Sequence, residues 1–269
     1  MRKFLWFLLI TSTLGAKKLI VTSVSPLRLI INEMVDTTQF KVINIVPPGQ
    51  NPHTFDPRPG DIRQIEKACV FIYIADVAET WAHRMIQNIP APKRPQIIKI
   101  WSLLGRKESV NINPHFWFDP HLVRKITINL ADSIENCGEV KVQSFLAKID
   151  SLDTWIKSNI TQLKRDCFVP SHNSWTVFAK AYGIKTTDVL WTSGGTELSP
   201  RKIVRIIKQA KKCHTNVLVL DSIYNPSLVT PFKDNGFKIV ILDPQGWDET
   251  SYTVFMRKNL KKLFEALNE

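Results

Sequence analysis

Short runs of β-branched residues alternate with stretches of helical period along this 269-residue chain, and one long helical stretch interrupts the alternation near its middle. Short apolar runs bounded by turn residues predict strands at 19–24, 40–46, 70–75, 97–101, 168–169, 187–191, 217–221 and 238–243. Apolar residues at three- and four-residue steps predict helices at 26–35, 59–67, 77–88, 173–182, 200–212, 226–235 and 250–267. This alternation predicts an α/β fold in which mostly parallel sheets are covered on both faces.

The middle of the chain predicts two consecutive helices. The first spans 121–136 and ends near Gly138, and the second spans 140–163 and is apolar along one whole face. Because the second is too long for an ordinary loop, we expect a rigid rod that joins two α/β lobes, packs against both and limits their closure to small shifts. A crossover helix within one larger sheet is the alternative. The predicted organisation is an N-terminal lobe at 17–120, a helical connector at 121–164 and a C-terminal lobe at 165–269.

The first 16 residues have the layout of a secretory signal peptide. Two basic residues precede an apolar run at 4–10, and small or polar residues follow at 11–16. We therefore expect residues 1–16 to be removed on export to the periplasm. No cysteine follows the apolar run, so the exported chain is expected to be soluble and not lipid-anchored. An uncleaved membrane anchor is the alternative interpretation.

Basic residues outnumber acidic ones. The chain carries 36 Lys and Arg against 24 Asp and Glu, a formal net charge of +12. Such an excess can indicate nucleic-acid binding, but here the basic residues are spread along helical stretches, and an exported protein rarely meets nucleic acid. We expect no nucleic-acid partner, and we interpret the charge as a solvated surface that favours an anionic membrane face.

The sequence has four cysteines and no Cys-x-x-Cys, so neither a thiolate zinc site nor a thioredoxin-like motif is indicated. Cys69 lies in an apolar strand-like run and is predicted to be a core residue. Cys167 and Cys213 each precede a predicted strand, and a disulfide between them is one option in an oxidising compartment.

Two segments nearly repeat each other, and each has a histidine after a proline: Asn51-Pro52-His53-Thr54-Phe55-Asp56-Pro57 and Asn113-Pro114-His115-Phe116-Trp117-Phe118-Asp119-Pro120. Proline fixes its own φ and restricts the residue before it, so each histidine is held on a stiff backbone. Imidazole is the commonest metal ligand in proteins. The repeat favours a metal site assembled from distant parts of the chain, whereas two unrelated turns with helix-capping histidines are the alternative.

Four candidate ligands are expected to meet in one cleft. His53, His115 and His172 each follow a strand-like segment and precede a helix, and Asp243 ends the last predicted strand. The C-terminal ends of parallel strands face the crevice in which such folds bind ligands. Three imidazoles and one carboxylate suit Zn²⁺, and Mn²⁺ or Fe²⁺ could also bind. The remaining histidines are predicted to point elsewhere: His83, His121 and His214.

The sequence lacks the common catalytic motifs. It has no His-Glu-x-x-His, no Gly-x-Ser-x-Gly and no glycine-rich phosphate loop, so no enzymatic activity is predicted. An exported zinc hydrolase, in which Asp243 acts as a base beside a metal-bound water, is the alternative.

Five segments in the same order resemble the cluster A-I metal-binding proteins, which are the zinc- or manganese-specific solute-binding components of ABC transporters. These segments are the two histidine repeats, the first extended through Arg58-Pro59-Gly60-Asp61, then Ser171-His172-Asn173 with Phe178-Ala179 and Tyr182-Gly183, Thr196-Glu197-Leu198-Ser199-Pro200, and Leu242-Asp243-Pro244-Gln245-Gly246. The resemblance covers essentially the whole mature chain. It implies two α/β lobes joined by a long helix, a metal held between them by His53, His115, His172 and Asp243, and delivery to the membrane permease of an ABC transporter.

The resemblance also bears on the metal, because histidine at the third ligand position is typical of zinc binders and glutamate of manganese binders. His172 therefore favours zinc. Many zinc members carry a long His- and Asp-rich loop that this chain lacks, and Asn51, Asn113 and Leu198 stand where Asp, Asp and Pro are common. These departures keep Mn²⁺ and Fe²⁺ open as cargo. Some relatives are described as adhesins, so an adhesin-like surface protein is the alternative from another class. We expect a monomer.

Overall fold

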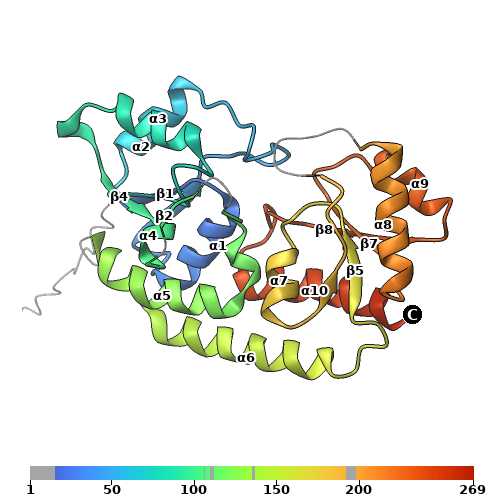
Figure 1. Ribbon diagram of the computed structural model, residues 1–269. Coiled ribbons are helices and arrows are strands. Elements are labelled where there is room, and N and C mark those ends of the chain that lie inside the picture. Colours follow the sequence, from blue (N-terminus) through green and yellow to red (C-terminus); the bar gives the residue numbers. More distant parts are fainter. Residues whose placement is uncertain (1–15, 106, 110–111, 135–136, 192–197) are drawn as a thin grey trace, which may run out of the picture.

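Two parallel β-sheets form the centres of two lobes in the computed structural model, which describes residues 16–269 except 106, 110–111, 135–136 and 192–197 (Figure 1). The N-terminal sheet has the strand order β2-β1-β3-β4, and the C-terminal sheet has the order β6-β5-β7-β8. Every strand pair within them is parallel. The strands are β1 Lys18–Thr22, β2 Phe40–Asn44, β3 Val70–Tyr73, β4 Gln96–Lys99, β5 Cys167–Pro170, β6 Lys185–Thr186, β7 Val217–Asp221 and β8 Lys238–Leu242.

Helices cover both faces of each sheet, as the alternating sequence pattern predicts (Figure 1). In the N-terminal half these are α1 Ser25–Met34, α2 Pro59–Glu66, α3 Thr80–Asn88, α4 Ile100–Leu103 and α5 Pro120–Ile134, with short 3-10 helices η1 Ala91–Lys93 and η2 Phe116–Phe118. In the C-terminal half they are α7 Thr176–Ala181, α8 Pro200–Lys212, η4 Pro226–Val229, α9 Thr230–Lys233 and α10 Tyr252–Asn268.

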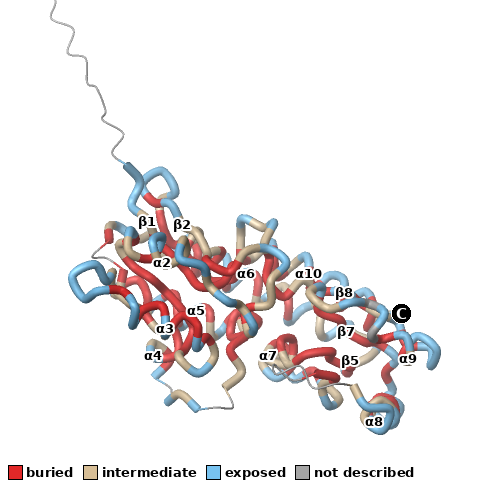
Figure 2. The backbone as a smooth tube through the Cα atoms, turned by 90° about the horizontal axis from the view of Figure 1, so that it is seen from above, coloured by how far each residue is buried: buried red, intermediate tan, exposed pale blue. Residues whose placement is uncertain are grey.

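Strand β7 shows why the strands of the C-terminal sheet have continuous apolar sequences. All five of its residues are buried, because successive side chains point to opposite faces and both faces are covered. Leu218 and Leu220 pack into the core beneath α8, whereas Val217 and Val219 pack into the larger core that includes α10. Figure 2 shows the sheets of both lobes as buried backbone beneath exposed helix faces and loops.

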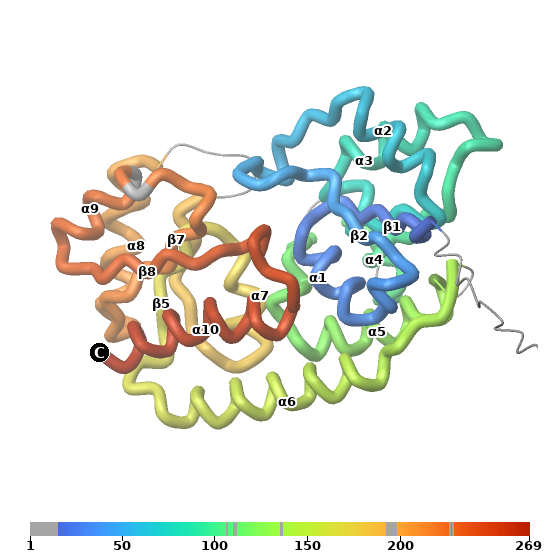
Figure 3. Tube along the Cα trace, turned by 180° about the vertical axis from the view of Figure 1, so that it is seen from behind, coloured from blue at the N-terminus to red at the C-terminus, as the bar shows by residue number. Residues whose placement is uncertain are grey.

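The long connector helix α6 Val142–Ile160 runs beneath both lobes (Figures 1 and 3). It contacts α1 and α5 of the N-terminal lobe and α10, which packs on β7 and β8 of the C-terminal lobe. The buried residues along α6 fall on one face of the helix, as its sequence pattern requires: Phe145, Leu146, Ile149, Leu152 and Ile156. The prediction of a rod that packs against both lobes is confirmed.

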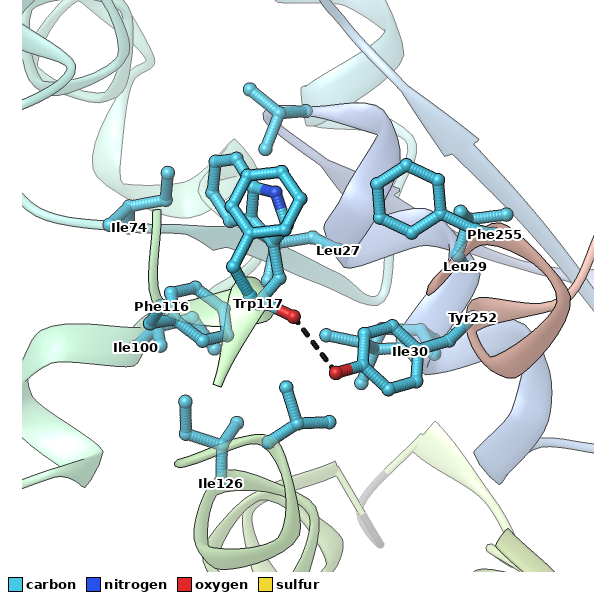
Figure 4. Close-up of a cluster of buried hydrophobic side chains, with 14 of the residues drawn as sticks. Leu27, Leu29, Ile30, Ile74, Ile100, Phe116, Trp117, Ile126, Tyr252 and Phe255 are labelled. Atoms are coloured by element: carbon cyan, nitrogen blue, oxygen red, sulfur yellow. Dashed lines mark hydrogen bonds between the residues drawn. The ribbon is translucent and has the colours of Figure 1, made fainter. Parts of the chain in front are cut away.

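The two lobes also share a core of buried apolar side chains (Figure 4). Trp117 and Phe118 of the N-terminal half lie against Tyr252, Phe255 and Trp175 of the C-terminal half, and the rings of Phe118 and Trp175 are 3.9 Å apart. The burial of such large rings on both sides opposes any wide separation of the lobes.

Gly246 lets two parts of this core approach closely. Its φ is +61°, and a Cβ atom there would lie 2.7 Å from the ring of Phe255 and 2.9 Å from Leu29. A side chain at this position would therefore meet both a strained backbone and a filled space. Glycine at this position therefore allows the loop after β8 to lie close against α1.

Cys167 and Cys213 form a disulfide that joins the start of β5 to the end of α8. The pairing that the sequence left as an option is confirmed. Cys69 is half-buried and Cys137 is buried, and neither is in a disulfide.

Three predicted elements are wrong in detail. Residues 187–191 do not extend β6 as a regular strand: the backbone N–H of Asp188 donates to the Gln209 side chain, and the N–H groups of Leu190 and Trp191 then donate to the Pro170 and Ser171 carbonyls at the end of β5. Residues 226–235 break into η4 and α9, since Pro231 has no N–H to continue the first helix. The run 97–101 ends in α4 instead of continuing as a strand.

The predicted signal peptide lies outside the described residues, except for residue 16. Where the structure does describe the chain, no helix combines the length and the apolar character needed to cross a membrane.

Candidate metal centre

Three histidine rings from three separate loops meet between the lobes. His53 lies between β2 and α2, His115 directly precedes η2, and His172 lies between β5 and α7. The ring centroids of His53 are 5.5 Å from His115 and 5.6 Å from His172, and those of His115 and His172 are 5.1 Å apart. Each ring offers one nitrogen within 4.8 Å of the nitrogens of the other two. Small ring movements can close this arrangement onto one ion with Zn–N bonds of about 2.0 Å.

All three rings are held neutral at pH 7. Only 4% of His115 and 2% of His172 is exposed, and His53 is partly buried. Burial lowers the pKa of each imidazole because it penalises the charged form, and neighbouring imidazoles lower it further in His115 and His172. The pKa of His172 falls to about 4. Neutral imidazole is the form that binds a metal ion.

The asparagine two residues before each repeat histidine fixes the loop. The Asn51 side-chain oxygen accepts the backbone N–H of His53 at 3.0 Å, and that of Asn113 accepts the backbone N–H of His115 at 3.1 Å. Both are the local turns that asparagine favours. The resemblance between the two sequence segments therefore reflects one backbone geometry used twice.

The side chain of Asn113 makes more hydrogen bonds within the site than that of Asn51. Its side-chain oxygen also lies 2.8 Å from Nδ1 of His115, so this ring nitrogen faces a hydrogen-bond acceptor and Nε2 is left for a metal. Its amide nitrogen donates to the Asn173 carbonyl at 2.8 Å and to Thr176 Oγ1 at 3.3 Å. Asn113 thus orients one candidate ligand while tying its loop to the loop that carries His172.

Within the described part of the chain, neither buried ring nitrogen of His172 has a hydrogen-bond partner of good geometry; the backbone of Trp191 raises its pKa against the larger effect of burial. Burying an imidazole without partners is unfavourable. The ring is placed edge-on toward His53, His115 and Tyr224, whose centroid is 6.2 Å away. A buried imidazole that faces two others is the arrangement expected of a metal ligand.

Asp243 is placed near the cleft but apart from the three-histidine group. It directly follows β8, its Oδ1 accepts the backbone N–H of Gln245 at 2.8 Å, and its own N–H donates to Asn259. The set of ligand atoms within 4.8 Å of one another contains the three histidines and not Asp243. Its role as a fourth ligand stays a prediction.

Asp221 is a second carboxylate on the same side of the cleft. It ends β7, is fully buried, and accepts the Ser174 hydroxyl at 2.7 Å. Burial raises its pKa to about 7, the Ser174 hydrogen bond opposes this, and the charge of Asp243 raises it further. The two carboxylates therefore lie close enough to repel each other, and a cation placed between the lobes relieves that repulsion.

Glu79 is a site residue that the sequence analysis missed. It lines a small pocket with His53, His115 and Trp117, and one carboxylate oxygen accepts the backbone N–H of Ile74 at 2.6 Å. Burial raises its pKa to about 7. The only sequence signal was an acidic residue at the start of helix α3, which is usually a solvated position.

Two indole N–H groups fasten the histidine loops. Trp81 donates to the carbonyl of Pro52 at 3.1 Å, and Trp117 donates to the carbonyl of Pro244 at 3.2 Å. The second bond joins the His115 loop to the loop after β8, across the lobe boundary. The tryptophans near the cleft hold the site in shape as well as lining it.

The other three histidines lie outside the cluster, as predicted. Nδ1 of His83 is 3.1 Å from the Asp76 carboxylate, and His121 lies between two aspartates. His214 has a positive φ of 52° after helix α8. The segment containing Thr196 and Glu197, part of the fourth resembling segment, lies outside the described residues.

This fold and site define a class of protein. The chain has two α/β lobes with parallel sheets, a rod-like helix that joins them and imidazoles that converge on the cleft. That is the architecture of a substrate-binding protein with a metal-ion cargo. The chain belongs to the family described as "ZnuA: Zinc-uptake complex component A periplasmic", whose sequence model matches residues 20–266.

Two curated relatives carry the names of other metals. The chain is 26% identical over 275 residues to "Manganese-binding lipoprotein MntA" of Halalkalibacterium halodurans, covering 96% of this chain and 91% of the relative. It is 24% identical over 283 residues to "Iron ABC transporter substrate-binding lipoprotein MtsA" of Streptococcus pyogenes, with the same shares covered.

Among solved structures, the laminin-binding protein Lmb of Streptococcus agalactiae, titled a bifunctional protein with adhesin and metal transporting activity, matches with a TM-score of 0.79 and 21% identity. The alignment covers 93% of this chain and 99% of that one. Together with the family match, these comparisons make the chain an extracytoplasmic, metal-binding component of an ABC transporter and not an enzyme.

Proposed function

We propose that this protein captures Zn²⁺ outside the cytoplasm and delivers it to the permease of its transporter. The observation that supports zinc is the donor set: three imidazoles within 4.8 Å of one another, two of them buried and one, His172, without a well-formed hydrogen bond among the described residues. Imidazole suits zinc, whereas manganese favours carboxylate and other oxygen donors. The family description names zinc as well.

The proposed ligands are His53, His115, His172 and Asp243. His115 binds through Nε2, because Nδ1 faces Asn113. Asp243 completes the coordination after a small approach of its loop, which supplies the negative charge that offsets part of the ion's own. Mn²⁺ or Fe²⁺ is the alternative cargo, because the manganese and iron relatives span nearly the whole chain.

Metal titration tests this proposal. Purified chain lacking residues 1–16 is titrated with Zn²⁺, Mn²⁺ and Fe²⁺ in competition with a chelator, beside His172→Ala and the matched control His83→Ala, whose histidine lies outside the cluster. We expect one tightly bound Zn²⁺ that Mn²⁺ cannot displace, weakened only by His172→Ala. Preferential Mn²⁺ or Fe²⁺ binding would change the cargo, and an equal loss in both variants would contradict the ligand set.

Delivery to the permease is proposed to need only small movements. The shared apolar core and α6 hold the lobes together, so the release step is expected to act on the histidine loops. Metal uptake by cells that lack the chain should be restored by the wild-type protein and not by a His53→Ala, His115→Ala double variant. Uptake restored equally by both proteins would refute the role of the site.

The finer location is also a proposal. We propose that the chain works in the periplasm as a released monomer with the lobes divided at 17–120, 121–164 and 165–269. The manganese and iron relatives are named lipoproteins, which argues for attachment instead. Fractionation of cells after labelling with a palmitate analogue distinguishes the two, because only an attached chain takes up the label and stays with the membrane.

Adhesion is a second candidate function, favoured by one surface. The start of α8 presents a shallow groove in which four of the six lining side chains are basic: Arg201, Lys202, Arg205 and Lys208, beside Ser199 and Val204. The similar structure named as a laminin-binding adhesin shows that this fold can serve both roles. Salt-sensitive binding to laminin that survives loss of His53 and His115 would support adhesion, and its absence would remove this candidate.

A further inference from the structure

Two thiols of the N-terminal lobe lie together at the base of its sheet, far along the chain from each other. Cys69 directly precedes β3, where its N–H donates to the Leu19 carbonyl at 2.8 Å and its own carbonyl accepts from Gln96. Cys137 lies in the turn between α5 and α6 and is 3% exposed. The thiols of Cys69 and Cys137 face each other closely enough for each to shift the pKa of the other.

The backbone around Cys137 is fixed from several sides. Lys18 of β1 donates from Nζ to the Cys137 carbonyl at 2.6 Å, and Gln96 of β4 donates from its side chain to the Ser133 carbonyl at 2.7 Å. These two strand residues flank Cys69 on β1 and β4. The position of the α5–α6 turn beneath the sheet is therefore set by contacts that do not involve the thiols.

The residues after Cys137 hold the turn equally closely. Gly138 has a φ of +147°, and a Cβ atom there would lie 2.7 Å from the ring of Phe40. Val140 pairs with Val35 in an antiparallel bridge, just past the end of α1. The two cysteines thus lie on an already ordered frame, which favours a disulfide where the separation and orientation of the backbone suit one.

We propose that Cys69 and Cys137 are a second disulfide site, closed by thiol–disulfide exchange after export. The existing Cys167–Cys213 bond places the chain in surroundings where cysteines are oxidised. Cys69 is the half-buried partner and can be reached by an oxidant, whereas Cys137 is enclosed. The oxidant is a disulfide, carried by a dithiol oxidoreductase or by a small molecule.

The exchange balances in two steps. The Cys69 thiolate attacks one sulfur of the oxidant's disulfide, forms a mixed disulfide and releases the other sulfur as a thiolate. The Cys137 sulfur, after losing its proton, attacks Sγ of Cys69, forms the new bond and releases the oxidant's second thiolate. Two electrons pass to the oxidant, which leaves as a dithiol, and two protons leave Cys69 and Cys137.

The local charges suit this order of attack. The Cys137 hydrogen bond lowers the pKa of Cys69 and outweighs the effect of its burial, and the nearby Lys18 lowers it further. The reciprocal hydrogen bond and burial raise the pKa of Cys137. Cys69 is therefore the thiol that reacts first, and Cys137 the one that resolves the mixed disulfide.

A bond here would connect the N-terminal sheet directly to the start of the connector helix. The start of α6 is already tied to α1 by the hydrogen bond from the Lys141 N–H to the Met34 carbonyl at 2.6 Å. The cross-link lies at the base of the sheet, opposite to the histidine loops at the C-terminal strand ends. We expect it to stiffen the lobe on the rod without changing the ligands.

Thiol counting on the exported wild-type chain tests the proposal. The protein is denatured without reductant in N-ethylmaleimide, and the intact mass gives the number of labels. We expect no label on any of the four cysteines, and a non-reduced tryptic digest should link peptide 68–84 to peptide 126–141. Two labels, mapped to Cys69 and Cys137, would overturn the proposal.

Two matched variants locate the bond. Cys137→Ser should carry one label, on Cys69, and Cys213→Ser should carry one label, on Cys167, with the 68–84 to 126–141 link intact. A link between Cys69 and either cysteine of the C-terminal lobe in the wild type would also refute the pairing. The tryptic map of the wild-type chain decides the question even if a variant fails to fold.

Discussion

Asn113 offers the sharpest test of how the site is built, because it contacts one ligand ring and the loop of another. Its side chain accepts from the N–H of His115, lies 2.8 Å from the Nδ1 atom of that ring, and donates to Asn173 and Thr176 of the opposite lobe. Replacement by alanine removes all of these bonds and leaves the ligand ring free to rotate and to change tautomer.

The expected loss follows from the partner that is removed. Groups that orient a metal-bound histidine contribute about 10–100-fold to metal affinity, which corresponds to about 1.4–2.7 kcal/mol. We therefore expect Asn113→Ala to weaken Zn²⁺ binding by that factor. Asn113→Asp keeps the acceptor for His115 but loses the donors to the other lobe, so its affinity should fall less than that of the alanine variant.

Asn51 provides the matched control. It occupies the same place in the first repeat, but its side chain accepts only the backbone N–H of His53. Asn51→Ala should reduce affinity less than Asn113→Ala. The assay is competition with a chromophoric zinc chelator at pH 7.5, on proteins shown by circular dichroism to be folded. Equal affinities of wild type and Asn113→Ala, or equal losses in the two alanine variants, would refute the orienting role.

Three further predictions concern the metal-free protein, measured by urea unfolding. The pKa of His172 is lowered to about 4, so between pH 6.5 and 4 the unfolded chain binds a proton that the folded chain does not. The free energy of unfolding should therefore fall by about 3 kcal/mol as the pH drops across this window. In His172→Gln the free energy of unfolding should depend less steeply on pH. The pKa of Asp221 is raised to about 7, so ionising this buried carboxyl destabilises the folded state as the pH rises. Asp221→Asn should therefore be more stable than wild type at pH 8, by up to about 4 kcal/mol, and this gain should vanish toward pH 4. A gain that stays constant with pH would contradict the raised pKa. Tyr252→Phe removes the buried hydrogen bond from the tyrosine hydroxyl to the Trp117 carbonyl, 2.8 Å long (Figure 4), and should destabilise by about 1–3 kcal/mol, whereas no measurable loss would mean that the carbonyl finds another donor.

The sequence predicted the architecture well because the signals were local and periodic. Parallel strands buried on both faces read as apolar runs, and α6 repeats its apolar positions over five turns. The prediction failed where a tertiary contact overrode the local pattern. Residues 187–191 have strand composition, but the hydrogen bond from Asp188 to Gln209 of α8 interrupts the ladder before Leu190 and Trp191 donate to carbonyls at the end of β5.

The sequence also singled out the three histidines that the structure brings together: His53 and His115 by the repeated Asn-Pro-His pattern of their loops, and His172 by its place between a predicted strand and a helix. Glu79 escaped because nothing local marks a helix-start glutamate as buried; only the packing of α3 against the first histidine loop buries it. The bond between Trp117 and Pro244 joins residues 127 positions apart, which no local pattern reports. The place of Asp243 in the coordination depends on such long-range packing and stays a prediction.

X-ray absorption spectroscopy of the zinc-loaded chain tests the central claim most directly, because it counts the imidazoles around the ion. The convergence of His53, His115 and His172 predicts three imidazole nitrogens at about 2.0–2.1 Å and an oxygen at a similar distance. Sulfur scatterers at about 2.3 Å, or a spectrum that fits fewer than two imidazoles, would contradict the claim that these three histidines hold the cargo.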